Sequence, residues 1–328
     1  MLQQLKSLFK KDAQDFPSFD GSNWKPVEHS VIISSEIKAA IADNGFYKVD
    51  ASSLADLDAL QRIYGSTHGK NKDSGGMFYS VYSQDREYRR KVDNELGAAL
   101  KPLLDALFQN YKTVINSFIV KHSGPKSEFY LHQDSTGLNE WKHSPLSLWM
   151  PLQDTRIENG CMWVVPKSQK WFSPYRGISF ASMFDEHREL LKPYLVPVEV
   201  KKGEALIFDN RIVHLSGANL GKDSRVVVMS GIFPKEAELI SVYRDEQANS
   251  PVEIYAQEED YLTENLNFYI DCTVRPRTGH KIGESKNVKL KMTADELREL
   301  LGKEATTSAV QYEASLTQVA CDIIQEPV

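Results

Sequence analysis

The sequence has little cysteine and no long apolar segment. Its three cysteines, Cys161, Cys272 and Cys321, are odd in number and far apart, so they predict neither a disulfide framework nor a Cys-x-x-Cys metal site. No run of about 18 apolar residues occurs, so no membrane-spanning helix is expected. Residues 1–11 have apolar positions at helical spacing but lack the uninterrupted apolar centre and cleavage site of a secretory signal. These absences predict a cytoplasmic protein with no membrane partner.

Excess positive charge is also absent. Lys and Arg number 39 against 45 Asp and Glu, which gives a formal net charge of −6. Binding to nucleic acid usually requires clustered basic residues, so no nucleic-acid partner is expected. The chain also lacks a Gly-x-Ser-x-Gly motif and a P-loop, so serine hydrolysis and nucleotide-driven chemistry have no support.

The order of apolar patterns predicts a mainly β protein with flanking helices. Helical patterns begin near Ser35 and Ser52, and a long one runs from about Glu87 to Tyr111. From Thr113 onward short apolar runs alternate with Gly, Pro and Asn turns, a pattern typical of a double-stranded β-helix (a jelly roll, cupin-like). The runs are Val114–Val120, Phe129–His132, Leu146–Leu152, Met162–Val165, Val196–Val200, Ala205–Phe208, Ile212–Leu215 and Arg225–Phe233.

Three regions follow from this pattern. Residues 31–240 form the expected jelly-roll domain with its N-terminal helices, and residues 1–30 form an N-terminal extension. After Pro234 the strand pattern stops, so we expect residues 241–328 to be a C-terminal extension that serves as a substrate lid or an oligomer contact. Within it we expect a helix at Met292–Leu301 and a flexible tail from about residue 304. The composition is compatible with a monomer or a homodimer.

A metal-binding pattern lies at the end of one expected strand. His132 and Asp134 are two residues apart, so in an extended strand both side chains point to the same face. His214, on a later strand, is the natural third ligand. Two histidines and one carboxylate on one side of an ion form the facial triad of non-haem iron(II) oxygenases, which leaves positions open for a cosubstrate and O2.

An arginine eleven residues after His214 supports this interpretation. Arg225 lies in an apolar strand, where an unpaired charge is costly, and its planar fork suits a carboxylate such as the distal one of 2-oxoglutarate. Ser216 points the same way as His214 and could donate a second hydrogen bond. The alternative is that Arg225 forms a structural salt bridge with Glu199 or Asp209.

These motifs resemble the phytanoyl-CoA dioxygenase family. The resemblance rests on His132-Gln133-Asp134, on the phrase from Asn159 to Gln169, and on His214-x-Ser216 with Arg225; it runs from about Val31 to Pro234. It implies that His132, Asp134 and His214 bind Fe(II), and that Arg225 and Ser216 hold 2-oxoglutarate. The family phrase Pro-Gly-Ser-His is Pro166-Lys167-Ser168-Gln169 here, a change at a turn that touches no ligand.

The expected activity is hydroxylation of a small-molecule substrate, with release of succinate and CO2. Related halogenases replace the metal carboxylate with a small residue, so Asp134 disfavours halogenation. A zinc hydrolase or cupin-type enzyme, and a non-catalytic binding protein on the same fold, remain alternatives. The candidate pocket residues are Trp149, Lys121, Asn116, Phe118, Phe78, Tyr79 and Tyr82.

Overall fold

The computed structural model describes residues 14–68, 76–245, 247, 249–264, 275–276 and 278–304. Its helices are α2 (Ser35–Asn44), α3 (Leu57–His68), α4 (Arg86–Leu107), α5 (Arg188–Leu191), α6 (Tyr261–Glu264) and α8 (Ala294–Glu304). Its strands are β1 (Gln14–Phe16), β2 (Phe46–Asp50), β3 (Met77–Tyr79), β4 (Tyr111–Lys121), β5 (Phe129–His132), β6 (Leu146–Pro151), β7 (Met162–Val165), β8 (Val196–Val198), β9 (Glu204–Asp209), β10 (Val213–Ser216), β11 (Arg225–Pro234), β12 (Leu239–Tyr243), β13 (Val252–Gln257) and β14 (His280–Ser285). Residues 1–11, with their helical spacing of apolar positions, and the tail expected from about residue 304 lie outside the described residues, apart from the end of α8.

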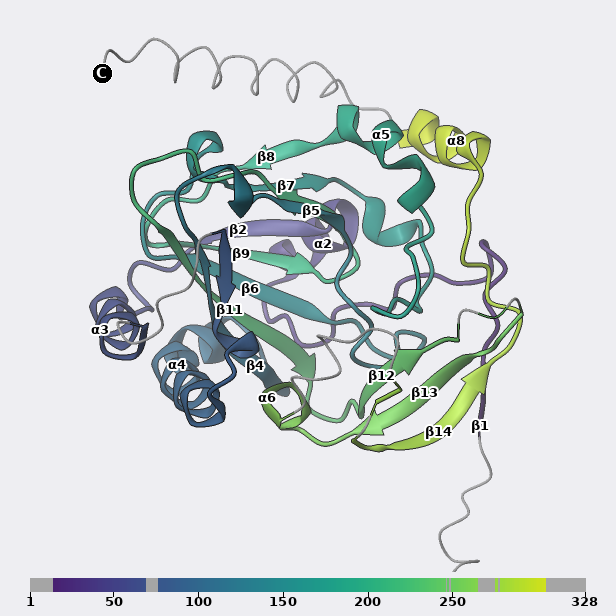
Figure 1. Ribbon diagram of the computed structural model, residues 1–328, viewed down its shortest axis with the longest axis horizontal. Coiled ribbons are helices and arrows are strands. Elements are labelled where there is room, and N and C mark those ends of the chain that lie inside the picture. The colour runs from purple at the N-terminus through teal and green to yellow at the C-terminus, as the bar shows by residue number, and fades with distance from the viewer. Residues whose placement is uncertain are drawn as a thin grey trace, which may run out of the picture.

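Two sheets form the predicted jelly roll (Figure 1). A six-stranded sheet has the order β2-β9-β6-β11-β4-β3, and a four-stranded sheet has the order β5-β10-β7-β8. Every pairing within both sheets is antiparallel. The eight strands predicted between residues 114 and 233 are the strands β4 to β11. The prediction of a mainly β jelly roll with flanking helices is confirmed.

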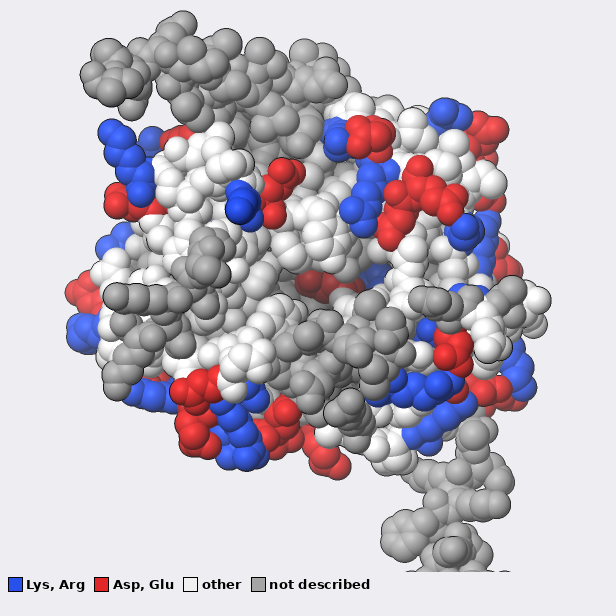
Figure 2. Space-filling model, viewed as in Figure 1, with Lys and Arg blue, Asp and Glu red and all other residues white. Residues whose placement is uncertain are grey.

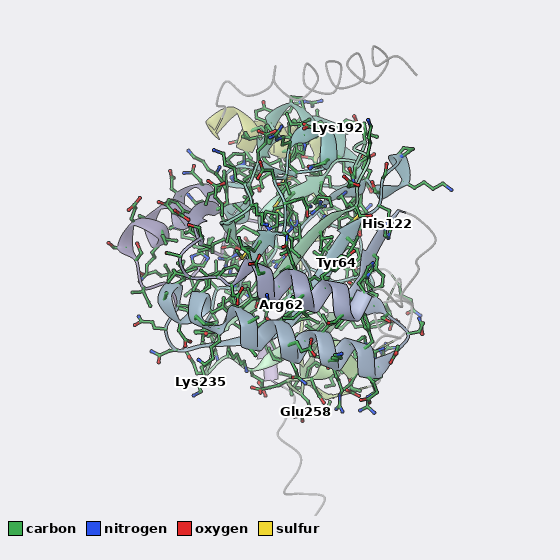
Figure 3. The ribbon with its side chains drawn as sticks, turned by 90° about the vertical axis from the view of Figure 1, so that its left-hand side faces the viewer. Arg62, Tyr64, His122, Lys192, Lys235 and Glu258 are labelled. Atoms are coloured by element: carbon green, nitrogen blue, oxygen red, sulfur yellow. The ribbon has the colours of Figure 1, made fainter. Side chains whose placement is uncertain are left out.

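Helices α3 and α4 cover the outer face of the six-stranded sheet. Figure 3 shows them lying side by side across it, with Arg62 and Tyr64 marking α3. The apolar side of α4 includes Leu96 and Leu100, which are fully buried in one core cluster with Phe118 of β4. Because successive strand residues point to opposite faces, the alternate residues of β4 face the other sheet. Ile119 belongs to that second core, between the two sheets, together with Trp149 and Phe208.

The start of α3 differs from the prediction. Ser52 does not cap the helix but turns back, and its amide donates to the Asp50 carboxylate at 2.9 Å. The cap is instead Asp56, whose carboxylate accepts from the Ala59 amide at 2.8 Å. The capping signal was present, but the residue that accepts from the first turn of the helix is Asp56, four positions after Ser52.

The absence of strands after Pro234 was predicted wrongly. Strands β12, β13 and β14 form a third sheet with β1, in the order β1-β14-β13-β12 (Figure 1). Almost every residue of β12 and β13 is buried, so neither strand shows the alternation of a half-exposed strand. Ile240 and Ile254 pack in a core with Trp163 of β7. This sheet also leads to α6, which reaches the central cavity.

The described part of the chain contains no helix that is both long and apolar enough to cross a membrane. The longest one, α4, has 22 residues and carries charged residues along its outer side.

A buried ion pair holds the turn between β9 and β10. Asp209 and Arg211 are 0% and 1% exposed, and the Arg211 guanidinium binds the Asp209 carboxylate through two nitrogens. His29 adds a third contact to Asp209, with 2.8 Å between Nε2 and Oδ2. Burial alone would raise the pKa of Asp209, but the charge of Arg211 and the hydrogen bonds from His29 and Arg211 lower it well below its usual range.

Replacing Asp209 with Asn should therefore destabilise the fold in a pH-dependent way. Removing one partner of a buried pair costs about 3–5 kcal/mol, so we expect a loss of that order in the free energy of unfolding at pH 7, measured by urea denaturation. Because the pKa is depressed in the folded state, the stabilisation is present above about pH 4 and is lost as the pH falls. The difference between wild type and Asp209→Asn should thus narrow on acidification. The exposed residue Asp105, which pairs with Lys101, provides the matched control. Asp105→Asn should leave the midpoint of urea denaturation unchanged. An equal loss of stability in both variants would contradict a stabilising role for the buried Asp209–Arg211 pair.

Candidate metal centre and cosubstrate site

The candidate ligands come together through one strand pairing in the smaller sheet. His132 ends β5 and His214 lies in β10, and the two residues are paired directly across the antiparallel ladder. They line a cavity of about 290 Å³ between the two sheets. The surface seen in Figure 2 has a hollow near its middle, with atoms of Asp or Glu residues inside it.

Three ligand atoms converge in this cavity. One atom from each of His132, Asp134 and His214 lies within 4.8 Å of the other two. The Asp134 carboxylate oxygen Oδ1 is 3.7 Å from Nε2 of His132 and 4.0 Å from Nε2 of His214. The spacing is suited to one ion bound by two imidazoles and one carboxylate.

Backbone carbonyls determine which nitrogen of each histidine is available. Nδ1 of His132 lies 2.9 Å from the Tyr130 carbonyl, and Nδ1 of His214 lies 3.0 Å from the Ile212 carbonyl. A carbonyl only accepts, so each Nδ1 carries the proton. Both Nε2 atoms, which face Asp134, therefore present a lone pair toward the cavity.

The charges in this cluster also favour a cation. Burial, and then the neighbouring His132, lower the pKa of His214 to about 4, so its imidazole is neutral at pH 7. Burial raises the pKa of Asp134, but its interactions with the two histidines and the charge of Arg176 outweigh burial, and the net shift is downward. A half-buried carboxylate that faces Nε2 of two imidazoles is suited to a positive charge. The other oxygen of Asp134, Oδ2, is buried without a hydrogen-bond partner among the described residues.

The backbone around Asp134 is fixed from two sides. Its amide donates to the Asn210 carbonyl at 3.0 Å, and its carbonyl accepts from Arg176 Nε at 2.8 Å. Arg176 is itself held by a buried ion pair with Glu140, at 2.8 Å between Nη1 and Oε2. The neighbouring Gln133 donates to the Arg211 carbonyl. The ligand-bearing turn is thereby tied to the buried Asp209–Arg211 pair.

Arg225 lies at the start of β11 and points into the same cavity. It is 2% exposed, and its Nε and Nη1 atoms have no hydrogen-bond partner among the described residues. Its guanidinium lies 5.3 Å from the centre of the Trp149 ring, and burial lowers its pKa to about 10. Ser216 lines the same cavity. An unpaired buried guanidinium beside a cavity is suited to an anionic ligand.

The alternative partners of Arg225 are engaged elsewhere. Asp209 binds Arg211 and His29, and the Glu199 carboxylate accepts from the Ile157 amide at 3.1 Å. The described residues therefore show no salt bridge from Arg225 to either of them.

The structure divides the candidate pocket residues into two groups. Trp149, Tyr79 and Tyr82 line the cavity. Lys121, Asn116, Phe118 and Phe78 do not. Phe118 and Phe78 pack in the core under the helices, Asn116 contacts Asp93 and Ser230, and Lys121 is buried beneath the end of β10.

Sequence reasoning chose the wrong side of β4 for two of its pocket candidates, Asn116 and Phe118. The strand is buried on both faces, so its apolar run shows no alternation that would identify the cavity side. The β4 residues that line the cavity are Val114, Ile115, Ser117 and Ile119, and Asn116 and Phe118 are not among them.

A usable signal lay on β11. Residues two apart share a face, so Met229, Gly231 and Phe233 lie on the side of Arg225, and all three line the cavity. Tyr261 and Leu262 of α6 also line it, and no motif pointed to them. They could not be found because their position depends on the third sheet.

Comparison with known sequences gives a family match over most of the jelly roll. The family model of phytanoyl-CoA dioxygenase (PhyH) matches residues 44–227. Phytanoyl-CoA dioxygenase 1 of Oryza sativa subsp. japonica is 33% identical over 135 residues, which cover 39% of this chain and 47% of the rice protein. Phytanoyl-CoA dioxygenase domain-containing protein 1 of Danio rerio is 29% identical over 127 residues, which cover 36% of this chain and 44% of the fish protein. The match thus spans about half the length of these relatives.

Solved structures give more distant likenesses. The carbocyclase SnoK from nogalamycin biosynthesis, described as non-heme and alpha-ketoglutarate dependent, aligns over 63% of this chain and 86% of its own, with 20% identity and a TM-score of 0.42. EctD from S. alaskensis, solved with 2-oxoglutarate and 5-hydroxyectoine, aligns over 70% and 86%, with 18% identity and a TM-score of 0.45.

The family match covers more than half of the 328 residues and includes the three converging ligands and Arg225. The chain therefore belongs to the phytanoyl-CoA dioxygenase family.

Proposed function

We propose that the protein is an Fe(II)- and 2-oxoglutarate-dependent dioxygenase that hydroxylates an unactivated C–H bond of a small metabolite or biosynthetic intermediate. The observation that carries the proposal is the joint presence, in one cavity, of the His132–Asp134–His214 triad and of Arg225, whose Nε and Nη1 atoms have no hydrogen-bond partner among the described residues. Dioxygenase is also the activity in the names of the rice and fish relatives.

The triad fits the metal. His132, Asp134 and His214 supply two neutral nitrogens and one carboxylate oxygen, the donor set of non-haem iron(II) oxygenases. When bound, iron and 2-oxoglutarate supply the oxidising chemistry: O2 converts the cosubstrate to succinate and CO2, and the substrate gains a hydroxyl group. The full set of three protein ligands supports hydroxylation rather than halogenation.

The protein's own contribution is to hold and orient. Tyr130 and Ile212 fix the imidazole tautomers, and Asn210 and Arg176 fix the backbone of Asp134. Ligand orientation therefore does not depend on the metal being present, and preorganisation of this kind lowers the cost of binding.

The cosubstrate would lie between the metal and Arg225. Arg225 and Ser216 would bind the distal carboxylate, because a fork of N–H donors matches a carboxylate and a hydroxyl can donate one further bond. The buried guanidinium would then gain the anionic partner that it lacks among the described residues.

The remaining cavity indicates the chemistry of the substrate. Apart from the triad and Arg225, the described residues that line it are uncharged. Ser117 and Ser147 offer hydroxyls, and Tyr79, Phe233 and Tyr261 offer aromatic surface. A cavity lined in this way suits an uncharged, largely apolar group that carries few hydrogen-bonding atoms. It supports a free small metabolite over a substrate that would bury a charged carrier.

The first test is the visible spectrum of the protein with Fe(II) and 2-oxoglutarate under strict exclusion of oxygen. We expect a weak metal-to-ligand charge-transfer band in the wild type and none in Asp134→Ala. Succinate release should fall by at least about a hundredfold in that variant, the loss that even an outer supporting group can cause. Bound iron without a band in the wild type would favour a zinc-type hydrolase, a cupin-type enzyme or a non-catalytic binding protein.

Replacing Arg225 with Ala should chiefly weaken binding of 2-oxoglutarate. Loss of a hydrogen-bonded charge is worth about 1.5–3 kcal/mol, or roughly tenfold to more than a hundredfold in the concentration that half-saturates the band. Iron affinity should stay unchanged, because Arg225 is not a ligand. The control is Arg62→Ala, at an arginine whose side chain is 71% exposed on α3 (Figure 3). An unchanged 2-oxoglutarate titration in Arg225→Ala would remove the residue from this role.

A further inference from the structure

Lys121 is a buried lysine directly beside the proposed cosubstrate site. It ends β4 and is paired across the ladder with Arg225 of β11, so the two Cβ atoms are about 5 Å apart. Its side chain is 0% exposed. Lys121 does not line the cavity. It lies beneath the end of β10 and contacts the backbone of Ser216, which does line the cavity.

Three backbone carbonyls surround its amino group. Nζ donates to the carbonyl of Ser216 at 3.0 Å, to that of Gly217 at 2.7 Å, and to that of Ser127. An ammonium group has three N–H donors, whereas a neutral amine has two and would turn its lone pair toward the third carbonyl. The arrangement therefore suits the charged form.

The lysine stem is enclosed as closely as its head. Gly160 has φ +81°, and a Cβ there would lie 3.0 Å from Cδ of Lys121 and 2.5 Å from the Gly217 carbonyl oxygen. The Asn159-Gly160 turn thus packs against both Lys121 and the backbone that Lys121 holds, which leaves the amino group little freedom to move away.

The two neighbouring cations lack a counter-charge. The described residues place no carboxylate within ion-pair distance of Lys121 or Arg225, whereas the buried Arg176 and Arg211 pair with Glu140 and Asp209. Burial, and then the charge of Arg225, lower the pKa of Lys121 to about 6, so a bound anion nearby is what would keep its amino group charged at pH 7. Two like charges in a region of low dielectric are costly unless an anion joins them.

We propose that Lys121 is a positioning residue for the cosubstrate. It fixes the backbone that carries Ser216, and it adds a second positive charge that selects a cosubstrate with a distal carboxylate. The inference rests on the proposed function, because it assigns Lys121 to the anionic end of 2-oxoglutarate.

The test compares two ligands that differ only at that end. 2-Oxoglutarate and 2-oxopentanoate share the keto acid that chelates the metal, but 2-oxopentanoate has a methyl group in place of the distal carboxylate. Dissociation constants are measured for both from the charge-transfer band, without oxygen and without turnover, in wild type, Lys121→Met and Lys121→Gln. The glutamine variant keeps hydrogen-bond donors and loses the charge.

We expect both variants to bind 2-oxoglutarate about tenfold to fiftyfold more weakly, as loss of a nearby charge at partial screening predicts, and 2-oxopentanoate less than about threefold more weakly. Lys101→Met, at an exposed lysine of α4, should change neither constant. If Lys121→Met does not fold, Lys121→Gln provides the comparison.

Two results would overturn the proposal. If both ligands bind more weakly by the same factor, Lys121 supports the structure of the site in general. If Lys121→Gln prefers 2-oxoglutarate as strongly as the wild type does, hydrogen bonding by this side chain is sufficient and its charge has no role. A wild type that shows no band would instead reject the proposed function, and this inference with it.

Discussion

The pairing of β5 with β10 is the constraint on which the rest of the site depends. It places His132 directly opposite His214, and their ring centres are 4.1 Å apart. Because strands in a sheet are separated by less than 5 Å, paired residues on one face come close enough to share one ion. Asp134, two residues beyond His132, then needs only a fixed turn to complete the triad.

That turn is fixed by buried charge rather than by apolar packing. The Asp209–Arg211 pair and the Arg176–Glu140 pair are both almost fully buried, and each holds backbone next to Asp134. Buried pairs of this kind contribute little net stability compared with well-packed apolar residues, but they are strongly directional. In this protein they specify where a ligand-bearing loop lies.

Charge balance distinguishes the site from its surroundings. Around Asp209 and Glu140 each buried charge has an opposite partner, whereas among the described residues no cationic side chain pairs with the triad and no carboxylate pairs with Arg225 or Lys121. The two deficits lie in and beside one cavity and have opposite signs. A metal ion and a dicarboxylate that chelates it would neutralise both at once, which is the physical basis of the proposed function.

The sequence by itself determined the jelly roll, the three candidate ligands and the role expected of Arg225. These depend on local pattern: β-type runs between turns, the two-residue spacing of His132 and Asp134, and a charge inside an apolar strand. Tertiary structure decided which face of β4 meets the cavity, because a strand buried on both sides carries no alternation to indicate it. It also decided the third sheet and the contribution of Tyr261, since the residues of β12 and β13 are buried by contacts with segments far away in the chain. The sequence named Lys121 as a pocket candidate, but its contacts were beyond the sequence, because its partners are backbone carbonyls, and every residue has one.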